Sequence, residues 1–197
     1  QHAAIADACL DALAGNNVYQ FHGCLARVLP TADTGGVRVD VLNDAKALDE
    51  LSRSATFYRM KRNRDGSTTP VPCDPTVQLA KGVQAARDLR CSILKRVATS
   101  PQLLPNGDVL AMAGYDSATG IYIAFGGIQW PSIPAKPTQA EALAALNFLY
   151  ANVLCDFPFR SNAARVAACA AILTVVVRNA IAGPVPLILI DSPSPGT

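Results

Sequence analysis

The spacing of apolar residues predicts five helices, three early in the chain and two late. In residues 44–54, Ala47, Leu48 and Leu51 recur at helical spacing, and Asn43 stands where an N-cap would accept a backbone hydrogen bond. The other helices are predicted on similar grounds at residues 3–13, 75–88, 138–154 and 162–182.

Capping residues set the expected bounds of the later helices. Asp74 is expected to cap the third helix, with Pro75 at its first helical position. Thr138 and Glu141 have the spacing of a capping box for the fourth helix. The fifth helix is expected to be capped near residue 161 and to end before Gly183.

Alternating or continuously apolar runs predict the strands. They cover residues 18–29, 37–41, 56–62, 67–71, 93–99, 102–104, 109–112, 121–125 and 185–190. His22-Gly23 is a possible turn in the first run, and Asp65-Gly66 indicates a hairpin between the third and fourth. The four runs from 93 to 125 are expected to form an antiparallel meander, with residues 114–120 as a turn. The last run, VPLILI, is typical of a central parallel strand buried on both faces.

Together these elements predict an α+β fold: a small, mainly antiparallel sheet with helices, followed by two helices and a strand. Three prolines in the segment QWPSIPAKP mark a change of composition at residues 129–137. We therefore expect an α+β domain at residues 1–128, a proline-rich linker at 129–137 and a helical segment at 138–197.

Composition and charge add a candidate partner to this picture. Half of the 197 residues are hydrophobic and 16% are charged, which excludes a disordered tail. The net charge of +2 is unevenly distributed, because residues 53–96 carry ten Lys or Arg against three Asp. A basic middle segment of this kind is typical of a surface that binds a polyanion.

The cysteines and histidines give no support to a metal site. The six cysteines are scattered without a C-x-x-C pair, and only two histidines are present, so a zinc cage is not predicted. Reduced thiols and a cytoplasmic location are expected, with Cys155 and Cys169 as small buried hydrophobes in apolar helices. The apolar stretches fall short of a membrane-spanning helix, and no membrane partner is expected.

The last residues of the sequence have the pattern of the first part of a P-loop. The apolar run at 185–190 leads into Ser194-Pro195-Gly196-Thr197, where the loop of a nucleotide-binding P-loop would wrap phosphates. The Gly-Lys-Ser/Thr that completes such a loop is not there. The alternative interpretation is a proline-rich terminus without a nucleotide site.

In its order of motifs, the chain resembles the region that precedes and enters the P-loop ATPase domain of phage- and plasmid-type replication helicase-primase proteins. The resemblance covers residues 93–197 well and residues 18–92 loosely. It rests on Pro137-Thr138-x-x-Glu141-Ala142, Asp156-Phe157-Pro158-Phe159, the alanine-rich helix ending at Val177-Arg178, Pro105-Asn106-Gly107-Asp108, Gly114-Tyr115-Asp116 and Thr119-Gly120. It implies a truncated ATPase entry at residues 138–197, with ATP and magnesium bound only by a full-length parent. For this chain we expect no catalytic residue, no enzyme activity and no cofactor.

The basic middle supplies the candidate nucleic-acid contacts. Cations alternate with Phe57 and Tyr58 along the predicted hairpin, and more follow at the end of the third helix. The candidate residues are Phe57, Tyr58, Arg59, Lys61, Arg62, Arg64, Arg87, Arg90, Lys95 and Arg96. The cations could meet phosphates, and an aromatic ring could stack on a base. The alternative is that a solvent-exposed hairpin and helix end simply carry these charges, without a ligand.

Three functional hypotheses follow. The first is a non-catalytic segment of a mobile-element DNA replication helicase or primase that binds DNA phosphates through the basic hairpin and helix end. The second is an interaction or oligomerisation module of an NTPase, in which the apolar helices join subunits and the basic patch is incidental. The third, an enzyme complete in itself, finds no supporting constellation of residues.

Overall fold

The computed structural model describes residues 2–31, 36–134 and 136–188, and its contacts divide the chain into two compact units. The first unit comprises Gln1–Ser100 and Ala113–Gln129, and the second comprises Pro101–Met112 and Trp130–Thr197. The sequence analysis had assigned residues 101–112 to the first domain. The protein is mixed α and β, with small sheets that are mainly antiparallel.

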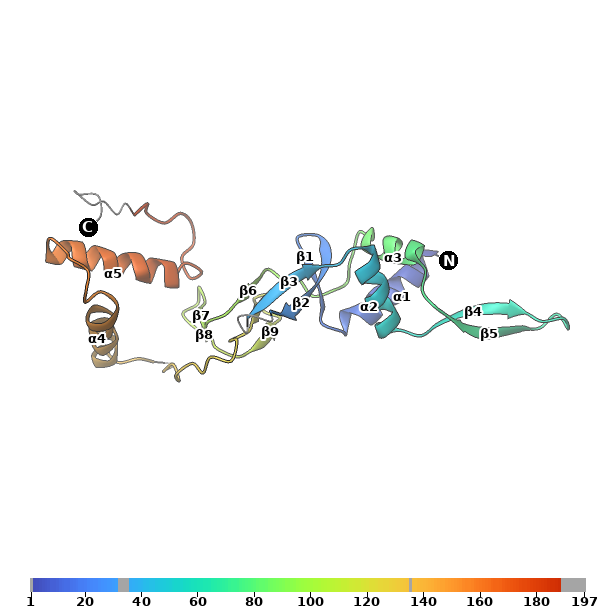
Figure 1. Cartoon of the computed structure of the whole chain (residues 1–197), viewed down its shortest axis with the longest axis horizontal. Helices are drawn as coiled ribbons and strands as arrows, with labels where there is room; N and C mark the ends of the chain where they lie inside the picture. The colour runs from blue at the N-terminus through green and yellow to red at the C-terminus, as the bar shows by residue number, and fades with distance from the viewer. Residues whose placement is uncertain (1, 32–35, 135, 189–197) are drawn as a thin grey trace. The chain divides into compact units, whose positions relative to one another are not determined.

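Three helices of the first unit pack on one another: α1 (His2–Ala14), α2 (Asp44–Ser54) and α3 (Val77–Gln84) (Figure 1). Each buries one apolar stripe, as amphipathic helices do. The core that they share with the neighbouring sheet is formed mainly by Leu10, Leu13, Val18, Leu25, Leu51, Ala80 and Val83.

The neighbouring sheet follows the predicted pattern. It contains β1 (Val18–Phe21), β2 (Cys24–Pro30) and β3 (Val37–Val41) in the order β1-β2-β3, all antiparallel. His22 and Gly23 form the tight turn between β1 and β2, with φ of 48° and 81°. Two successive residues with positive φ match the twist of the flanking strands, so the predicted turn is confirmed.

The second sheet of this unit differs from the predicted meander. It contains β6 (Arg96–Ala98), β9 (Gly114–Asp116) and β10 (Ile121–Ile123) in the order β6-β10-β9. β10 pairs antiparallel with β9 but parallel with β6, so the prediction of an antiparallel meander was wrong. The long connection from β6 to β10 permits the parallel pairing. Residues 114–116, expected in a turn, form β9.

Two further strands make a ribbon that joins α2 to α3. The predicted hairpin is confirmed as β4 (Phe57–Arg62) paired antiparallel with β5 (Thr68–Cys73). Helix α3 then begins later and ends earlier than expected. Its N-cap is Thr76, whose hydroxyl accepts the Leu79 N–H at 3.2 Å, rather than Asp74. It ends at Gln84 because the chain must turn for Leu89 to enter the core.

The second unit contains a small hairpin and two helices. The hairpin pairs β7 (Gln102–Leu103) with β8 (Val109–Leu110). Helix α4 (Gln139–Phe148) continues through a π-helical turn, η1 (Leu149–Val153), and α5 spans Asn162–Val176. The predicted capping box is confirmed, since Thr138 and Glu141 exchange side-chain and backbone hydrogen bonds. The β-branched run TVVV ends α5 at Val176, earlier than residue 182.

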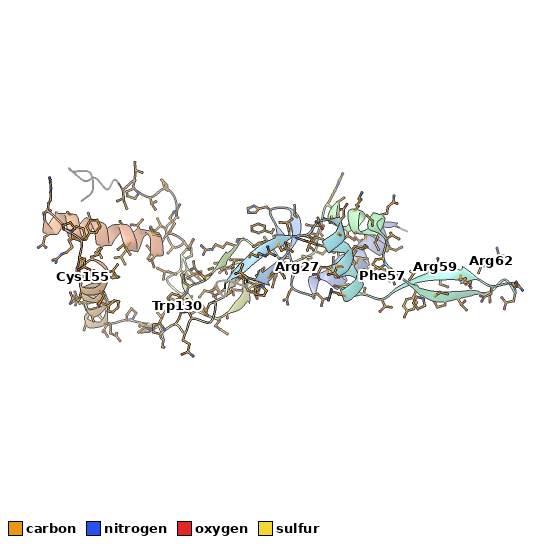
Figure 2. The ribbon with its side chains drawn as sticks, viewed as in Figure 1. Arg27, Phe57, Arg59, Arg62, Trp130 and Cys155 are labelled. Carbon is orange, nitrogen blue, oxygen red and sulfur yellow. The ribbon has the colours of Figure 1, made fainter. Side chains whose placement is uncertain are left out.

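Two expectations for the second unit were wrong. Residues 185–188 do not form the expected buried strand, and Leu187 is 97% exposed. A strand needs a hydrogen-bonded neighbour, and in the described part of the chain nothing pairs with these four residues. Cys155, expected to be buried, is exposed just beyond η1 (Figure 2), whereas Cys169 is buried as expected. Residues 189 and 190 lie outside the described residues.

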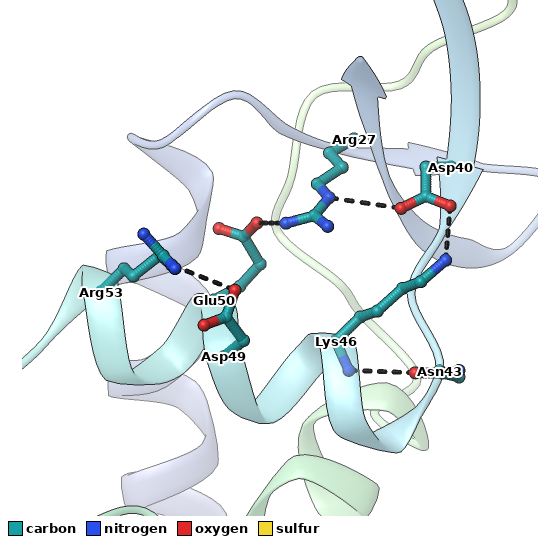
Figure 3. Close-up of polar contacts among 7 residues, drawn as sticks. All are labelled: Arg27, Asp40, Asn43, Lys46, Asp49, Glu50 and Arg53. Atoms are coloured by element: carbon teal, nitrogen blue, oxygen red, sulfur yellow. Dashed lines mark hydrogen bonds and ion pairs between the residues drawn. The ribbon is translucent and has the colours of Figure 1, made fainter.

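A network of ion pairs joins the first sheet to α2 (Figure 3). Arg27 of β2 donates to Asp40 of β3 and to Glu50 of α2, and Lys46 of α2 donates to Asp40 at 2.5 Å. Both carboxylates are only 9% exposed. The hydrogen bond from Lys46, together with the nearby charges, lowers the pKa of Asp40 against the opposing effect of its burial.

This pKa shift predicts a loss of stability in acid. Because the folded-state pKa of Asp40 is lowered below its ordinary value of 3.8, its contribution is complete above that pH and is lost as the pH falls through the folded pKa. We expect an Asp40→Asn variant to be less stable than the wild type at pH 7, with a smaller difference between the two at pH 2. Urea unfolding at both pH values measures this. An Asp49→Asn variant, which loses an exposed ion pair with Arg53, is the control and should change little. A difference that stays constant with pH would contradict the prediction.

Candidate nucleic-acid interface

The candidate interface is the β4–β5 ribbon, residues 57–73, which extends away from the three helices of the first unit (Figure 1). Its strands are held by six registered pairs, from Phe57 opposite Cys73 to Arg62 opposite Thr68. An isolated two-stranded ribbon is marginally stable in water, so its turn and its anchorage at the base must hold it in shape.

The tip of the ribbon is organised by local hydrogen bonds. The Asn63 N–H donates to the Ser67 carbonyl at 2.8 Å, and Gly66 takes a φ of 84° that closes the turn. The Asp65 carboxylate accepts from the Ser67 N–H at 2.9 Å and from its hydroxyl at 2.6 Å, which lowers the pKa of Asp65. These bonds leave the exposed Arg64 side chain at the tip without a role in the turn.

The pairing gives the ribbon two chemically different faces. Residues directly opposite each other in an antiparallel pair point to the same face, and neighbours along a strand point to opposite faces. One face, the cationic face, carries Arg59 and Lys61 with Val71 and Thr69 opposite them. All of these except Val71 are exposed.

The second face, the apolar face, carries Tyr58 opposite Pro72 and Met60 opposite Pro70. Tyr58 is 59% exposed, Met60 is 64% exposed, and both prolines are exposed. Arg62 follows on the same face beside the tip. The ribbon therefore presents an apolar strip to solvent, with cations on its other face and at its end.

The ribbon cations are electrostatically free. Among the residues that the structure describes, none of Arg59, Lys61, Arg62 and Arg64 forms an ion pair, and Figure 2 shows Arg59 and Arg62 along the ribbon. Against these four cations the ribbon has one acid, Asp65. Other cations of the first unit are paired with acids: Arg27, Lys46, Arg53, Lys81 and Arg90.

The predicted contact Phe57 lies at the base of the ribbon, where it serves the fold. Its ring is partly buried and packs against the hydrophobic core of the first unit. Together with Thr56, Pro72 and Asp74 it lines a shallow hollow of about 350 Å³ between the ribbon and the end of α2. Phe57 anchors the ribbon, so that Tyr58 is the aromatic ring of β4 that faces solvent.

The four predicted contacts beyond α3 are not brought onto the ribbon. Because α3 ends at Gln84, they lie in the connection to β6 and in β6 itself. Arg87 and Lys95 are exposed. Arg90 is held against α1 by Asp7 at 3.2 Å and Asp11 at 3.0 Å.

Arg96 differs from these residues in being partly buried. Its burial lowers the pKa of the guanidinium from an ordinary value far above neutrality. Arg96 starts β6, where it lies opposite Ile121 of β10. Because it is partly buried, the side chain is less available to a ligand than the exposed ribbon cations.

The predicted incomplete P-loop, Ser194, Pro195, Gly196 and Thr197, lies outside the described residues. Within the described ranges, no three His, Cys, Asp or Glu side chains gather as ligands for a metal ion. In the same ranges, the helices are too short or too polar to cross a bilayer.

Sequence reasoning missed the apolar face of the ribbon. It identified Tyr58 but not Met60, Pro70 or Pro72, because a proline in a strand indicates an edge strand and does not by itself indicate a binding surface. The signal was the alternation itself: once the turn is centred on Asp65 and Gly66, every second residue of both strands is assigned to one face. No family model, curated protein or solved structure matches the chain.

Proposed function

We propose that this chain is a non-catalytic DNA-binding segment that contacts phosphates through its β4–β5 ribbon. The observation that carries the proposal is the set of four exposed cations, Arg59, Lys61, Arg62 and Arg64, without acidic partners among the described residues. A charged side chain that serves only stability is usually paired or spread among opposite charges, as Arg27 and Arg53 are here. Four unpaired cations on a projecting ribbon are suited to a polyanion.

The cations can reach phosphates on both sides of the ribbon. Arg59 and Lys61 point from the cationic face, Arg62 points from the apolar face, and Arg64 stands at the tip. A strand of DNA that crosses or follows the ribbon would meet several of them at once. Arg87 and Lys95 are exposed and could extend the path, whereas Arg90 and Arg96 are engaged within the fold.

DNA is proposed as the polyanion because of the resemblance to replication helicase-primase proteins. In that setting the chain would guide DNA towards a P-loop motor, and ATP and magnesium would be bound by the full-length parent.

The proposal predicts DNA binding that weakens steeply with salt. Each neutralised phosphate releases condensed counterions, so four contacts to a single strand give a slope of about −2.8 in log K against log salt concentration. Fluorescence anisotropy of labelled DNA, titrated with the full chain at 50 and 200 mM salt, measures the slope. Bovine serum albumin is a control for non-specific association. Absence of binding at 50 mM salt would contradict the proposal.

A second candidate function is oligomerisation through the second unit. Helix α4 buries none of its residues, and α5 buries only Cys169 among those described. Their exposed apolar side chains include Leu143, Phe148, Val166, Leu173 and Val176. A surface of this kind favours association with a second copy of the chain. Sedimentation of the DNA-free protein at the same two salt concentrations separates the candidates, because an apolar interface does not weaken with salt.

A further inference from the structure

The apolar face of the ribbon indicates more than phosphate binding. Tyr58, Met60, Pro70 and Pro72 form a continuous strip, since Tyr58 lies opposite Pro72 and Met60 opposite Pro70. The Asn63 N–H to Ser67 carbonyl bond shows that odd-numbered residues of β4 form the hydrogen-bonded pairs. The even-numbered pairs, which carry the strip, are therefore the closely spaced pairs, in which opposite side chains lie closer together.

A strand from a second copy of this chain is a poor occupant for this ribbon. Pro70 and Pro72 occupy positions whose N–H would point outward, so the outer edge of β5 lacks donors there. The outer edge of β4 is free of proline, but a second β4 strand paired with it would bring Arg59 and Lys61 close to the same cations of the other copy. Like charges across strands are unfavourable.

The ligand must therefore offer apolar planes together with negative charge. Unpaired nucleobases have both, because each base has a π-face and each nucleotide a phosphate. A duplex buries its base faces and presents the edges of its base pairs in its grooves, which are read mainly by hydrogen-bonding side chains. On the apolar face, the side chains that could form such bonds are Tyr58 through its hydroxyl, Arg62, and Thr68 opposite Arg62, and they lie at the two ends of the apolar strip.

The spacing of the strip favours the same ligand. Tyr58 and Met60 are two residues apart on one strand, which corresponds to roughly 6.8 Å. Bases stacked in a duplex follow one another at about 3.4 Å on each strand. Successive bases can cover both positions only if the strand is extended and its bases are unstacked.

We propose that the ribbon binds single-stranded DNA in preference to duplex, with one base stacked on Tyr58 and a neighbouring base on Met60 and Pro70. Arg62 contacts the adjoining phosphate on this face, and Arg59, Lys61 and Arg64 attract the strand electrostatically. This inference rests on the proposed function and adds the class of its substrate.

The test is a Tyr58→Thr, Met60→Thr double variant, which removes the two β4 side chains of the apolar strip while it keeps every charge and the β-propensity of the strand. The probe is a labelled mixed-sequence oligonucleotide of about 16 nucleotides, used alone and annealed to its complement. We expect the wild type to bind the single strand more tightly. The variant should lose about 10- to 100-fold in single-strand affinity, with its salt slope unchanged and its duplex binding unaltered.

A Met112→Thr, Val175→Thr variant is the matched control, because both residues are exposed and belong to the second unit. Circular dichroism and urea unfolding establish that both variants are folded. Equal or tighter duplex binding by the wild type, or an unchanged single-strand affinity in the Tyr58 and Met60 variant, would overturn this inference and leave the proposed function in place. If neither DNA binds at low salt, the proposed function itself fails. Binding to anionic phospholipid vesicles without binding to DNA would overturn both.

Discussion

Replacing Arg59, Lys61, Arg62 and Arg64 by glutamine should weaken single-stranded DNA binding by about 100- to 1,000-fold at 0.1 M salt. The estimate follows from counterion release, because each phosphate contact contributes about 0.7 logarithmic units at this salt concentration. The same variant should flatten the slope of log K against log salt concentration by about 2.8. The loss should be largest at low salt. Fluorescence anisotropy across a salt series measures both quantities.

The matched control removes four other exposed cations, Arg38, Lys136, Arg160 and Arg178, which changes the net charge of the chain equally. If the ribbon forms the interface, this control should lose far less affinity than the ribbon variant. Equal losses would show that DNA responds to the total charge of the chain, and the interface would not be the ribbon. Neither set contributes to a hydrophobic core, so both variants should remain folded.

Replacing Leu51 by alanine should destabilise the first unit by about 3–4 kcal/mol. Leu51 is fully buried in α2, where it belongs to the core formed with α1 and α3. The substitution loses the free energy gained when the leucine side chain moves from water into the interior, and it leaves a cavity in a closely packed core. Urea unfolding followed by circular dichroism measures the change in the free energy of unfolding.

Leu143→Ala is the control for this effect, because Leu143 is 52% exposed in α4. A substitution at a surface position is expected to change stability by no more than about 0.5 kcal/mol. The two variants together test where the core of this protein lies. Similar losses in both would show that α4 is buried against another part of the protein or against a second copy.

Local sequence signals predicted most elements of the first unit. The Asn43 cap, the turn at His22-Gly23 and the hairpin turn at Asp65-Gly66 were found at the predicted positions. Each depends on backbone preferences that one to four residues determine by themselves. The capping box at Thr138 and Glu141 was recognised in the second unit for the same reason.

The wrong predictions concern features that depend on contacts between residues distant in the sequence. The pairing of β10 with β6 is parallel, and no local pattern distinguishes the two directions of pairing for strands of three residues. Helix α3 ended early because Leu89 and Cys91 enter the core. Residues 185–188 have the composition of a buried strand, but no strand in the described part of the chain pairs with them, and they remain irregular with Leu187 and Ile188 exposed.

The candidate site was predicted only in part. Its cations were evident from the sequence, but charge alone does not show which of them are neutralised. In the fold, Arg90 is paired with Asp11, which lies 79 positions earlier in the chain, while Arg59 keeps its charge unpaired among the described residues. Phe57, which appeared equivalent to Tyr58, packs against the core instead.

The sequence by itself determined most helices and strands of the first unit, the hairpin turn and the concentration of positive charge at residues 53–96, because these depend on neighbours along the chain. Only the tertiary structure decided which cations are free, which aromatic ring faces solvent and which apolar residues form one strip. Ion pairing, burial and the sharing of a face all depend on distances between residues far apart in sequence, and folding alone sets those distances.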